Sequence, residues 1–376
     1  MRTFACACGN TVYFANTRCL ACGKELGYLS DAVALVALEP LGEGRYKPLA
    51  YGLRTRAVRK CRNWVEHDVC NWLVDDADPS PLCRSCRLTR IIPNLAVPNN
   101  RRYWYELELN KRRMFYGLAQ LRLPLVGQDE DPDHGLAFAF MSDSPERNTY
   151  FERLGGDQSV MTGHAHGLIT INVAEADDAS REWMRVKMDE RYRTLLGHFR
   201  HEVGHYYWDR LVRDDPAARP AFDGLFGPPG DDYAAALKRY YGKGARPGWE
   251  ESFITAYASA HPWEDWAETW SHYLHIRATM DTALFHGILP FGSALGHLRR
   301  REGRVGTKPE NVEVPAHVDF DDLLRDWVEL AVAMNGINTS MGFSHLYPFV
   351  LTPAVREKMR LVHRVVEAAG APASAG

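Results

Sequence analysis

Apolar side chains recur at intervals of three and four residues near the middle of the chain, which is the spacing of one helix face. Between residues 194 and 211 the apolar positions with this spacing are Leu195, Leu196, Phe199, Val203, Tyr206 and Tyr207. Such a stripe predicts a helix whose apolar face packs against a core. Asp214, Asp215 and Pro216 follow the stripe and predict that the helix has ended by this point.

Other segments have helical or alternating spacing. Helices are predicted at Trp104–Leu121, at Asp321–Met334 and from Thr352-Pro353 onward, where the threonine is an N-cap and the proline occupies the first helical position. Strands are predicted at Ala32–Leu38, Tyr46–Leu53, Gly135–Met141 and Gly167–Ala174. The order indicates an α+β protein with a small β head and a mainly helical body that contains a small sheet. A proline-containing linker after residue 92 predicts a head at 1–92 and a body at 93–376.

The helix predicted at 194–211 carries the H-E-x-x-H pattern as His201-Glu202-Val203-Gly204-His205. Histidines four residues apart lie on the same helix face, so both imidazoles can reach one Zn²⁺. Glu202 is then positioned to take a proton from a zinc-activated water. His198 is an alternative ligand one turn earlier, although the i, i+4 pair already provides the geometry that zinc prefers.

All eight cysteines lie between Cys6 and Cys86, and they form two sets. The first set is Cys6, Cys8, Cys19 and Cys22, and the second is Cys61, Cys70, Cys83 and Cys86. Because no apolar leader opens the sequence, metal binding explains this cluster better than disulfides do. The pattern predicts two four-thiolate zinc sites in a zinc-ribbon-like or rubredoxin-like region. Interleaved sites, for example Cys6 and Cys8 with Cys83 and Cys86, remain an alternative, as does His67 as a substitute ligand.

Charge is divided unevenly along the chain. Residues 1–113 carry 18 Lys and Arg against 11 Asp and Glu, whereas the remaining residues carry 27 against 37. A basic head with tryptophans among its arginines could bind nucleic acid or a protein, but a basic face docked on the acidic body is the preferred interpretation. The sequence has neither a signal-peptide pattern nor a run of 18 apolar residues, which predicts a cytoplasmic protein without a membrane span.

Residues 252–276 carry a second informative stripe. Pro262 suits a helix start, and Glu264, Glu268 and His272 follow at intervals of four residues. Tryptophans flank this acidic stripe, which is unusual for a solvated face. The helix therefore either supplies a third zinc ligand or is a surface helix with an acidic pair.

The H-E-V-G-H helix followed by Glu264-Asp265-Trp266-Ala267-Glu268 resembles the glutamate zincins, including the anthrax lethal factor type. In that pattern the first glutamate of E-x-x-A-E binds zinc, which implies this role for Glu264. The resemblance also implies that Glu268 orients a ligand histidine. Tyr257, seven residues before Glu264, matches the tyrosine that polarises the scissile carbonyl.

More of the chain resembles the bacterial zinc-binding metallopeptidase family that carries an N-terminal zinc-ribbon region. The matching segments are Phe4–Gly27, Cys70–Leu73, Leu82–Arg87, His201–Leu211 and His261–His275. The spacing Cys6-x-Cys8 departs from the family's usual C-x-x-C, which affects the geometry of the first thiolate site. The resemblance implies a zincin-like body, one catalytic zinc ion and two structural zinc ions.

These observations together predict a zinc metallopeptidase that acts on a peptide or protein substrate. The rival interpretation is a nucleic-acid-binding or protein-binding zinc-ribbon module on a catalytically idle zincin body. A general base, a carbonyl-polarising tyrosine and a third ligand are features of an enzyme, and they favour the first interpretation.

Overall fold

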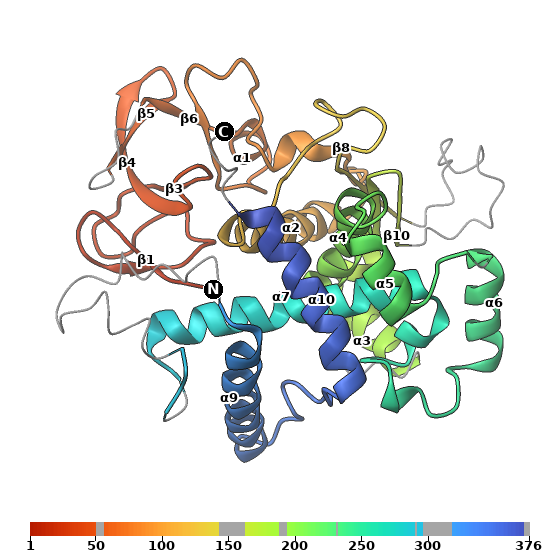
Figure 1. Ribbon diagram of the computed structural model, residues 1–376. Coiled ribbons are helices and arrows are strands. Elements are labelled where there is room, and N and C mark those ends of the chain that lie inside the picture. The colour runs from red at the N-terminus through yellow and green to blue at the C-terminus, as the bar shows by residue number, and fades with distance from the viewer. Residues whose placement is uncertain are drawn as a thin grey trace. The chain divides into compact units, whose positions relative to one another are not determined.

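The computed structural model describes residues 1–49, 56–142, 162–187, 194–230, 232–289, 292–295 and 318–371 (Figure 1). The chain divides into two compact units, which are described separately. One unit contains residues 2–116 and 125–196, and the other contains residue 1, residues 117–124 and residues 197–376.

The first unit begins with the strands of the cysteine-rich region, drawn in red and orange in Figure 1. The strands β1 (Phe4–Ala5) and β2 (Thr11–Val12) form an antiparallel pair. A five-stranded antiparallel sheet follows in the order β3 (Leu26–Leu29), β4 (Ala34–Gly42), β5 (Arg45–Leu49), β6 (Val58–Lys60) and β7 (Leu73–Asp75). The strand predicted at Ala32–Leu38 is confirmed as β4. The strand predicted at Tyr46–Leu53 is confirmed as β5 through Leu49, and its remaining residues lie outside the described part of the chain.

A second sheet in the same unit has the order β10, β11, β9, β8. Its strands are β8 (Thr89–Ile91), β9 (Ala137–Met141), β10 (Gly163–Ala165) and β11 (Leu168–Asn172). The strands predicted at Gly135–Met141 and Gly167–Ala174 are thus confirmed. Every residue of β9 is buried, as expected for a strand between two parallel neighbours and covered on both faces.

Short helices complete this unit around one long helix. They are α1 (Arg62–Val65), the 3₁₀ turns η1 (Cys86–Leu88) and η3 (Val173–Ala176), and α3 (Asp178–Lys187). The long helix α2 runs from Asn100 to Gln120 and begins four residues earlier than predicted. Its residues through Tyr116 belong to the first unit. Because β8 and β9 pair inside this unit, the limits of the two compact units do not coincide with the domain boundary predicted at residue 92. That domain boundary remains a prediction.

The second unit is built from helices around α7 (Pro262–His286), most of which is buried. The other helices are α4 (Leu195–Leu211), α5 (Ala218–Phe226), α6 (Tyr233–Lys243), η4 (Trp249–Glu251), η5 (Tyr257–Ala260), α9 (Phe320–Ser340) and α10 (Pro353–Gly370). Figure 1 shows α10 crossing α7, and the two helices are in contact. The helices predicted around 194–211, 321–334 and from Thr352 are confirmed.

Capping explains where these helices begin and end. The side chain of His261 accepts a hydrogen bond from the N–H of Trp263, and Pro262 occupies the first helical position of α7. Gly287, in the left-handed conformation at φ 70°, ends the helix. Thr352 caps α10 by accepting a hydrogen bond from the N–H of Val355.

The architecture confirms the predicted fold class, a cysteine-rich β region followed by a mainly helical part with a small sheet. No helix in the described ranges is both long enough and apolar enough to cross a membrane.

A buried ion pair joins α10 to the first turn of α7. Lys358 Nζ lies 2.6 Å from Asp265 Oδ2 and also donates to the carbonyl of Ser252 at 2.7 Å. Burial raises the pKa of Asp265 to about 7, although Lys358 opposes the shift. Because Asp265 follows Glu264 directly, this pair fixes the turn that carries the predicted third ligand.

We expect Lys358→Met to lower the free energy of unfolding by about 3–5 kcal/mol, because Asp265 is left buried without its cation. The loss should grow as pH rises from 5 to 8, since the unpaired carboxyl can be protonated in the folded state only at low pH. Urea denaturation measures both effects. Arg360→Met, which removes the half-buried partner of the exposed Asp321, serves as the control and should change stability little. Equal losses in the two variants would contradict the importance of the buried pair.

Candidate metal centre

The two helices that carry the predicted ligands cross at a glycine. A Cβ at Gly204 would lie 3.1 Å from the Cα of Ala267 in α7 and 3.1 Å from Cδ1 of Trp270. The indole N–H of Trp266 donates to the carbonyl of Gly204 at 3.0 Å. Small residues on both sides therefore let the two backbones approach closely, and the histidine face of α4 lies against the first turns of α7.

This crossing brings the three predicted ligands together. The Nε2 atom of His201 lies 3.0 Å from Glu264 Oε2, and the Nε2 atom of His205 lies 3.7 Å from the same oxygen. One donor atom from each residue lies within 4.8 Å of the other two. Two imidazole nitrogens and one carboxylate oxygen are the donor set of many catalytic zinc sites, which keep a further position open. The residues present therefore fit a zinc ion.

Glu268 contacts the other ring nitrogen of His201. Its Oε1 lies 2.6 Å from His201 Nδ1, and its Oε2 accepts a hydrogen bond from the Thr255 hydroxyl at 2.8 Å. A carboxylate on Nδ1 fixes the orientation of the imidazole and increases its basicity as a ligand. The structure thus places Glu268 where the resemblance implied, and it adds Thr255, which the sequence analysis did not identify.

A second residue that the sequence analysis missed is Tyr233, at the start of α6. Its hydroxyl donates a hydrogen bond to Glu264 Oε1, which leaves Oε2 facing the two histidines. The Tyr233 ring packs edge-on against His261 and Trp263. The ring centroid of Trp263 in turn lies 4.1 Å from that of His205. The signal in the sequence is weak, because a tyrosine 31 positions before its partner belongs to no recognised spacing.

Tyr257 lies near the first ligand histidine, His201. Its ring centroid is 6.0 Å from that of His201 and 5.4 Å from that of Tyr240. Burial raises the pKa of Tyr257 well above its ordinary value, and the carboxylate of Glu264 adds to the shift. The hydroxyl therefore stays protonated and can act as a hydrogen-bond donor.

The predicted base, Glu202, is buried beside the ligand set. Burial raises the pKa of its carboxyl, while the nearby His201 and His205 oppose the shift. In the described part of the chain, its Oε2 atom has no hydrogen-bond partner. A carboxylate with a raised pKa and an oxygen not engaged in a hydrogen bond is suited to accept a proton near neutral pH.

Two other histidines near the predicted site stand apart from the ligand set. His198, the alternative ligand, is not a member of the His201, His205 and Glu264 group. His272, the last residue of the acidic stripe, lies 2.9 Å from the Tyr347 hydroxyl, and burial lowers its pKa to about 4. A neutral, hydrogen-bonded histidine in this position serves the packing of α7.

Carboxylates and imidazoles shift the pKa values of one another in the ligand set. Burial lowers the pKa of His201, but Glu264 and Glu268 outweigh burial and raise the pKa well above its ordinary value. Burial likewise raises the pKa of Glu264, but His205 and His201 hold it well below the usual range. Two carboxylates and two imidazoles converging in a buried place favour a cation there.

The eight cysteines form two separate groups rather than interleaved ones. One group contains Cys6, Cys8, Cys19 and Cys22, and the other contains Cys61, Cys70, Cys83 and Cys86. Neighbouring sulfurs lie 3.6–3.7 Å apart, as for Cys6 with Cys22 and for Cys70 with Cys83. This separation is too long for a disulfide, but it matches the edge of about 3.8 Å of a tetrahedron with Zn–S bonds of about 2.3 Å.

Backbone and side-chain groups support the second group of thiolates. Trp72 N–H donates to Cys70 Sγ at 3.3 Å, and Cys83 N–H donates to Cys61 Sγ at 3.4 Å. His67, the possible substitute ligand, lies outside the group and stacks on Trp104 with ring centroids 5.2 Å apart.

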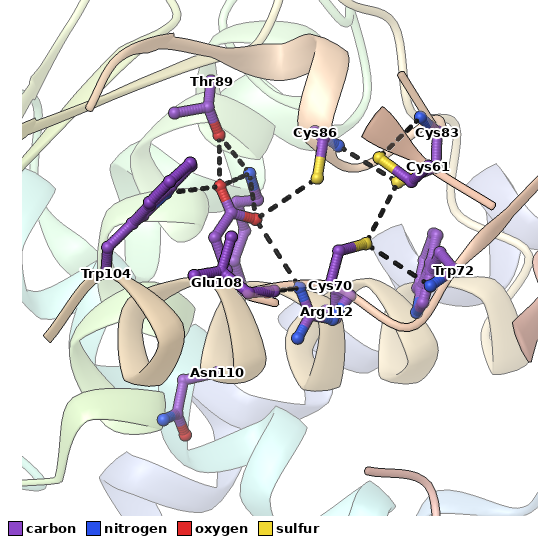
Figure 2. Close-up of polar contacts among 12 residues, drawn as sticks. Cys61, Cys70, Trp72, Cys83, Cys86, Thr89, Trp104, Glu108, Asn110 and Arg112 are labelled. Atoms are coloured by element: carbon purple, nitrogen blue, oxygen red, sulfur yellow. Dashed lines mark hydrogen bonds and ion pairs between the residues drawn. The ribbon is translucent and has the colours of Figure 1, made fainter. Parts of the chain in front are cut away.

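A buried charge cluster on α2 lies beside the second group, as Figure 2 shows for Glu108 and Arg112. Glu108 lies 2.9 Å from Lys111 Nζ and accepts a hydrogen bond from Thr89 Oγ1 at 2.7 Å. Arg112 donates to the carbonyl of Val69 at 2.8 Å. Burial lowers the pKa of Arg112, but Cys70 and Glu108 outweigh it and raise the pKa. The guanidinium thus compensates the thiolate charge.

We expect Tyr233→Phe to weaken zinc binding at the His201, His205 and Glu264 set about 10- to 100-fold, because Glu264 loses the partner that orients it. Competition with a chelator of known zinc affinity measures the effect. Tyr273→Phe is the matched control, since it deletes a buried hydroxyl of α7 that bonds His363 instead. Unchanged affinity in Tyr233→Phe would contradict the orienting role.

Comparison with known proteins places the chain in a family. Residues 100–365 match the family described as "Putative zinc-binding metallo-peptidase", and residues 3–97 match a zinc-ribbon domain. Uncharacterized proteins of Mycobacterium tuberculosis and Mycobacterium bovis are each 40% identical over 368 residues, which cover 98% of this chain and 96% of each relative. No solved structure matches the chain. With its buried histidine and glutamate set and its two four-cysteine groups, the chain belongs to the zinc-binding metallo-peptidase family and carries a zinc-ribbon domain.

Proposed function

We propose that the protein is a zinc-dependent peptide-bond hydrolase with His201, His205 and Glu264 as the ligands of the catalytic ion. The observation that carries the proposal is that two imidazole nitrogens and one carboxylate oxygen, the donors of a catalytic zinc site, converge beside the buried carboxyl group of Glu202. A structural zinc site is usually closed by four protein ligands, whereas three ligands and an adjacent base are the arrangement of a hydrolase.

Glu202 performs the proton transfers in this mechanism. When bound, zinc supplies the Lewis acidity that makes water a nucleophile at neutral pH. Glu202 accepts the proton of the attacking water, and its raised pKa makes the carboxylate basic enough to do so. The same carboxyl group then donates this proton to the leaving amine.

Tyr257 and Tyr233 have different tasks. The Tyr233 hydroxyl is engaged by Glu264, whereas the Tyr257 hydroxyl has no hydrogen bond to a carboxylate within the described residues. The Tyr257 hydroxyl stays protonated and is the donor for the oxyanion of the tetrahedral intermediate. Tyr233 instead orients Glu264, and Glu268 orients His201. The substrate class is a peptide or protein, in keeping with the family.

The alternative is a nucleic-acid-binding or protein-binding zinc-ribbon module on a catalytically idle body. The basic head favours it. However, binding by the head does not account for Glu202, because burial of its carboxyl costs stability and a catalytic role would explain why it is there.

We expect Glu202→Gln to keep all bound zinc and to lose activity about 10²- to 10⁴-fold, because the general base is removed. Cleavage of a quenched-fluorescence peptide library measures turnover. Glu250→Gln, an exposed acid in the same unit, is the control and should be fully active. Undiminished cleavage by Glu202→Gln would disprove the assignment of the base.

We expect the purified protein to contain three zinc ions per chain, one for each donor group, and His201→Ala/His205→Ala to contain two. Elemental analysis measures the content. Cys83→Ser/Cys86→Ser should lose a different ion and destabilise the zinc-ribbon region, because metal binding supplies part of its folding energy. Two ions in both the native protein and the histidine variant, even after added zinc, would contradict a catalytic metal site and favour the idle body.

A further inference from the structure

The unit that contains the zinc ribbon has a cavity of about 530 Å³ that the proposed hydrolase activity does not use. Two loops of the head and one face of α2 line it, and Cys70 of the second thiolate group lies in its wall. Small-molecule sites in proteins typically have volumes of about 300–1,000 Å³. The cavity is therefore large enough to enclose a ligand of nucleotide size.

Cations dominate the walls of this cavity. Arg101, Arg102 and Arg112 line it, and Asp68 is the one acidic residue among its lining residues. Arg101 and Arg102 are exposed at the start of α2, whose first turn contains no acidic side chain. The free N–H groups and the dipole of a helix start add to the attraction for an anion. Since Glu108 and the thiolates compensate Arg112, the exposed arginine pair is the anion-binding part of the wall.

Two buried polar atoms in the lining lack partners. Arg112 is 1% exposed and Asn71 is 3% exposed. Among the described residues, Arg112 Nε and Asn71 Oδ1 have no hydrogen-bond partner. Both side chains are fixed by their other ends, because Arg112 donates to the Val69 carbonyl at 2.8 Å and Asn71 donates to the Phe14 carbonyl at 2.6 Å. A fixed donor and a fixed acceptor in one cavity are complementary to a ligand that offers both an acceptor and a donor.

Tyr105 adds an aromatic group to the same wall. It is half-buried and lies one helical turn after Arg101 on α2, so the ring and the cation share a face of the helix. Aromatic rings stack on nucleobases, and Asn side chains read their polar edges. An acidic peptide would satisfy the arginines, and its amide groups offer a donor and an acceptor, but its backbone has no aromatic ring to stack on Tyr105.

We propose that this cavity binds a nucleotide, with the base at Tyr105, Asn71 and Arg112 and the phosphate at Arg101 and Arg102. Asp68 is placed to accept hydrogen bonds from ribose hydroxyls. The ligand is either a free nucleotide or the terminal nucleotide of a single strand, since both present the same base, sugar and phosphate. Peptide hydrolysis is not required for this binding.

The test uses the full-length zinc-loaded protein, ADP as the mononucleotide probe and a fluorescein-labelled single-stranded 12-mer as the strand probe. We expect saturable ADP binding that Arg101→Ala/Arg102→Ala weakens at least about tenfold, because both phosphate contacts are removed. Tyr105→Ala should weaken it about 5- to 100-fold through lost stacking. Arg45→Ala/Arg62→Ala removes the same charge from exposed positions of the same unit outside the cavity and should change binding less than about twofold. Zinc content and circular dichroism verify that each variant is folded.

Competition distinguishes the two sources of the ligand. If ADP displaces the 12-mer, the cavity holds a strand end; if ADP binds and the 12-mer does not, the ligand is a free nucleotide, and both results support the proposal. If ADP does not bind and both pairs of arginine substitutions weaken binding of the 12-mer equally, the basic surface attracts nucleic acid in general. This result would overturn the proposal. Binding of inorganic phosphate as tight as that of ADP, with no effect of Tyr105→Ala, would also overturn the assignment of a nucleotide.

Discussion

The close crossing of α4 and α7 is the constraint on which the candidate metal centre depends. The ligand atoms come from two separate helices, and no loop adjusts the distance between His205 and Glu264. That distance is determined by the absence of a side chain at Gly204 and by the small side chain of Ala267. The bond from the Trp266 indole to the Gly204 carbonyl fixes the register of the crossing. Sites built on packed helices retain their geometry better than sites on loops, which suits the catalytic ion that we propose here.

The zinc-ribbon region follows a different principle. Its thiolate groups add to the small apolar core of this short β region, and the buried Arg112 of a helix outside the ribbon partly compensates the charge of the second group. Glu108, Lys111 and Arg112 are all almost fully buried, so each depends on the others and on Thr89 or Val69 for its hydrogen bonds. The long helix α2 is thereby attached to the ribbon through buried polar contacts as well as through the aromatic contacts of Tyr116 with Phe4 and Phe14.

The fold class, most helices and the donor groups could be predicted from the sequence because each depends on local spacing. The His201 and His205 pair follows from the helix period, and the cysteine sets follow from short turns. Tyr233 and Lys358 could not be found this way, because their partners lie 31 and 93 positions away. The buried charges of α2 have the same composition as a solvated helix face, so periodicity alone does not distinguish the two. The three-residue strand β8 pairs with β9, which is distant in the sequence, so no local pattern indicates that β8 is a strand.

The ion pair between Lys358 and Asp265 has a consequence for when the metal centre can form. Ribosomes deliver α4 and the start of α7 well before α10, and chains fold progressively as they emerge. Until Lys358 emerges, Asp265 has no cation, and the turn that bears Glu264 lacks the contact that orders it. The nascent chain can therefore present its two histidines early but complete its ligand set only after α10 has emerged. Such an order would delay metal binding at the proposed site until the helix that holds Asp265 in place is available.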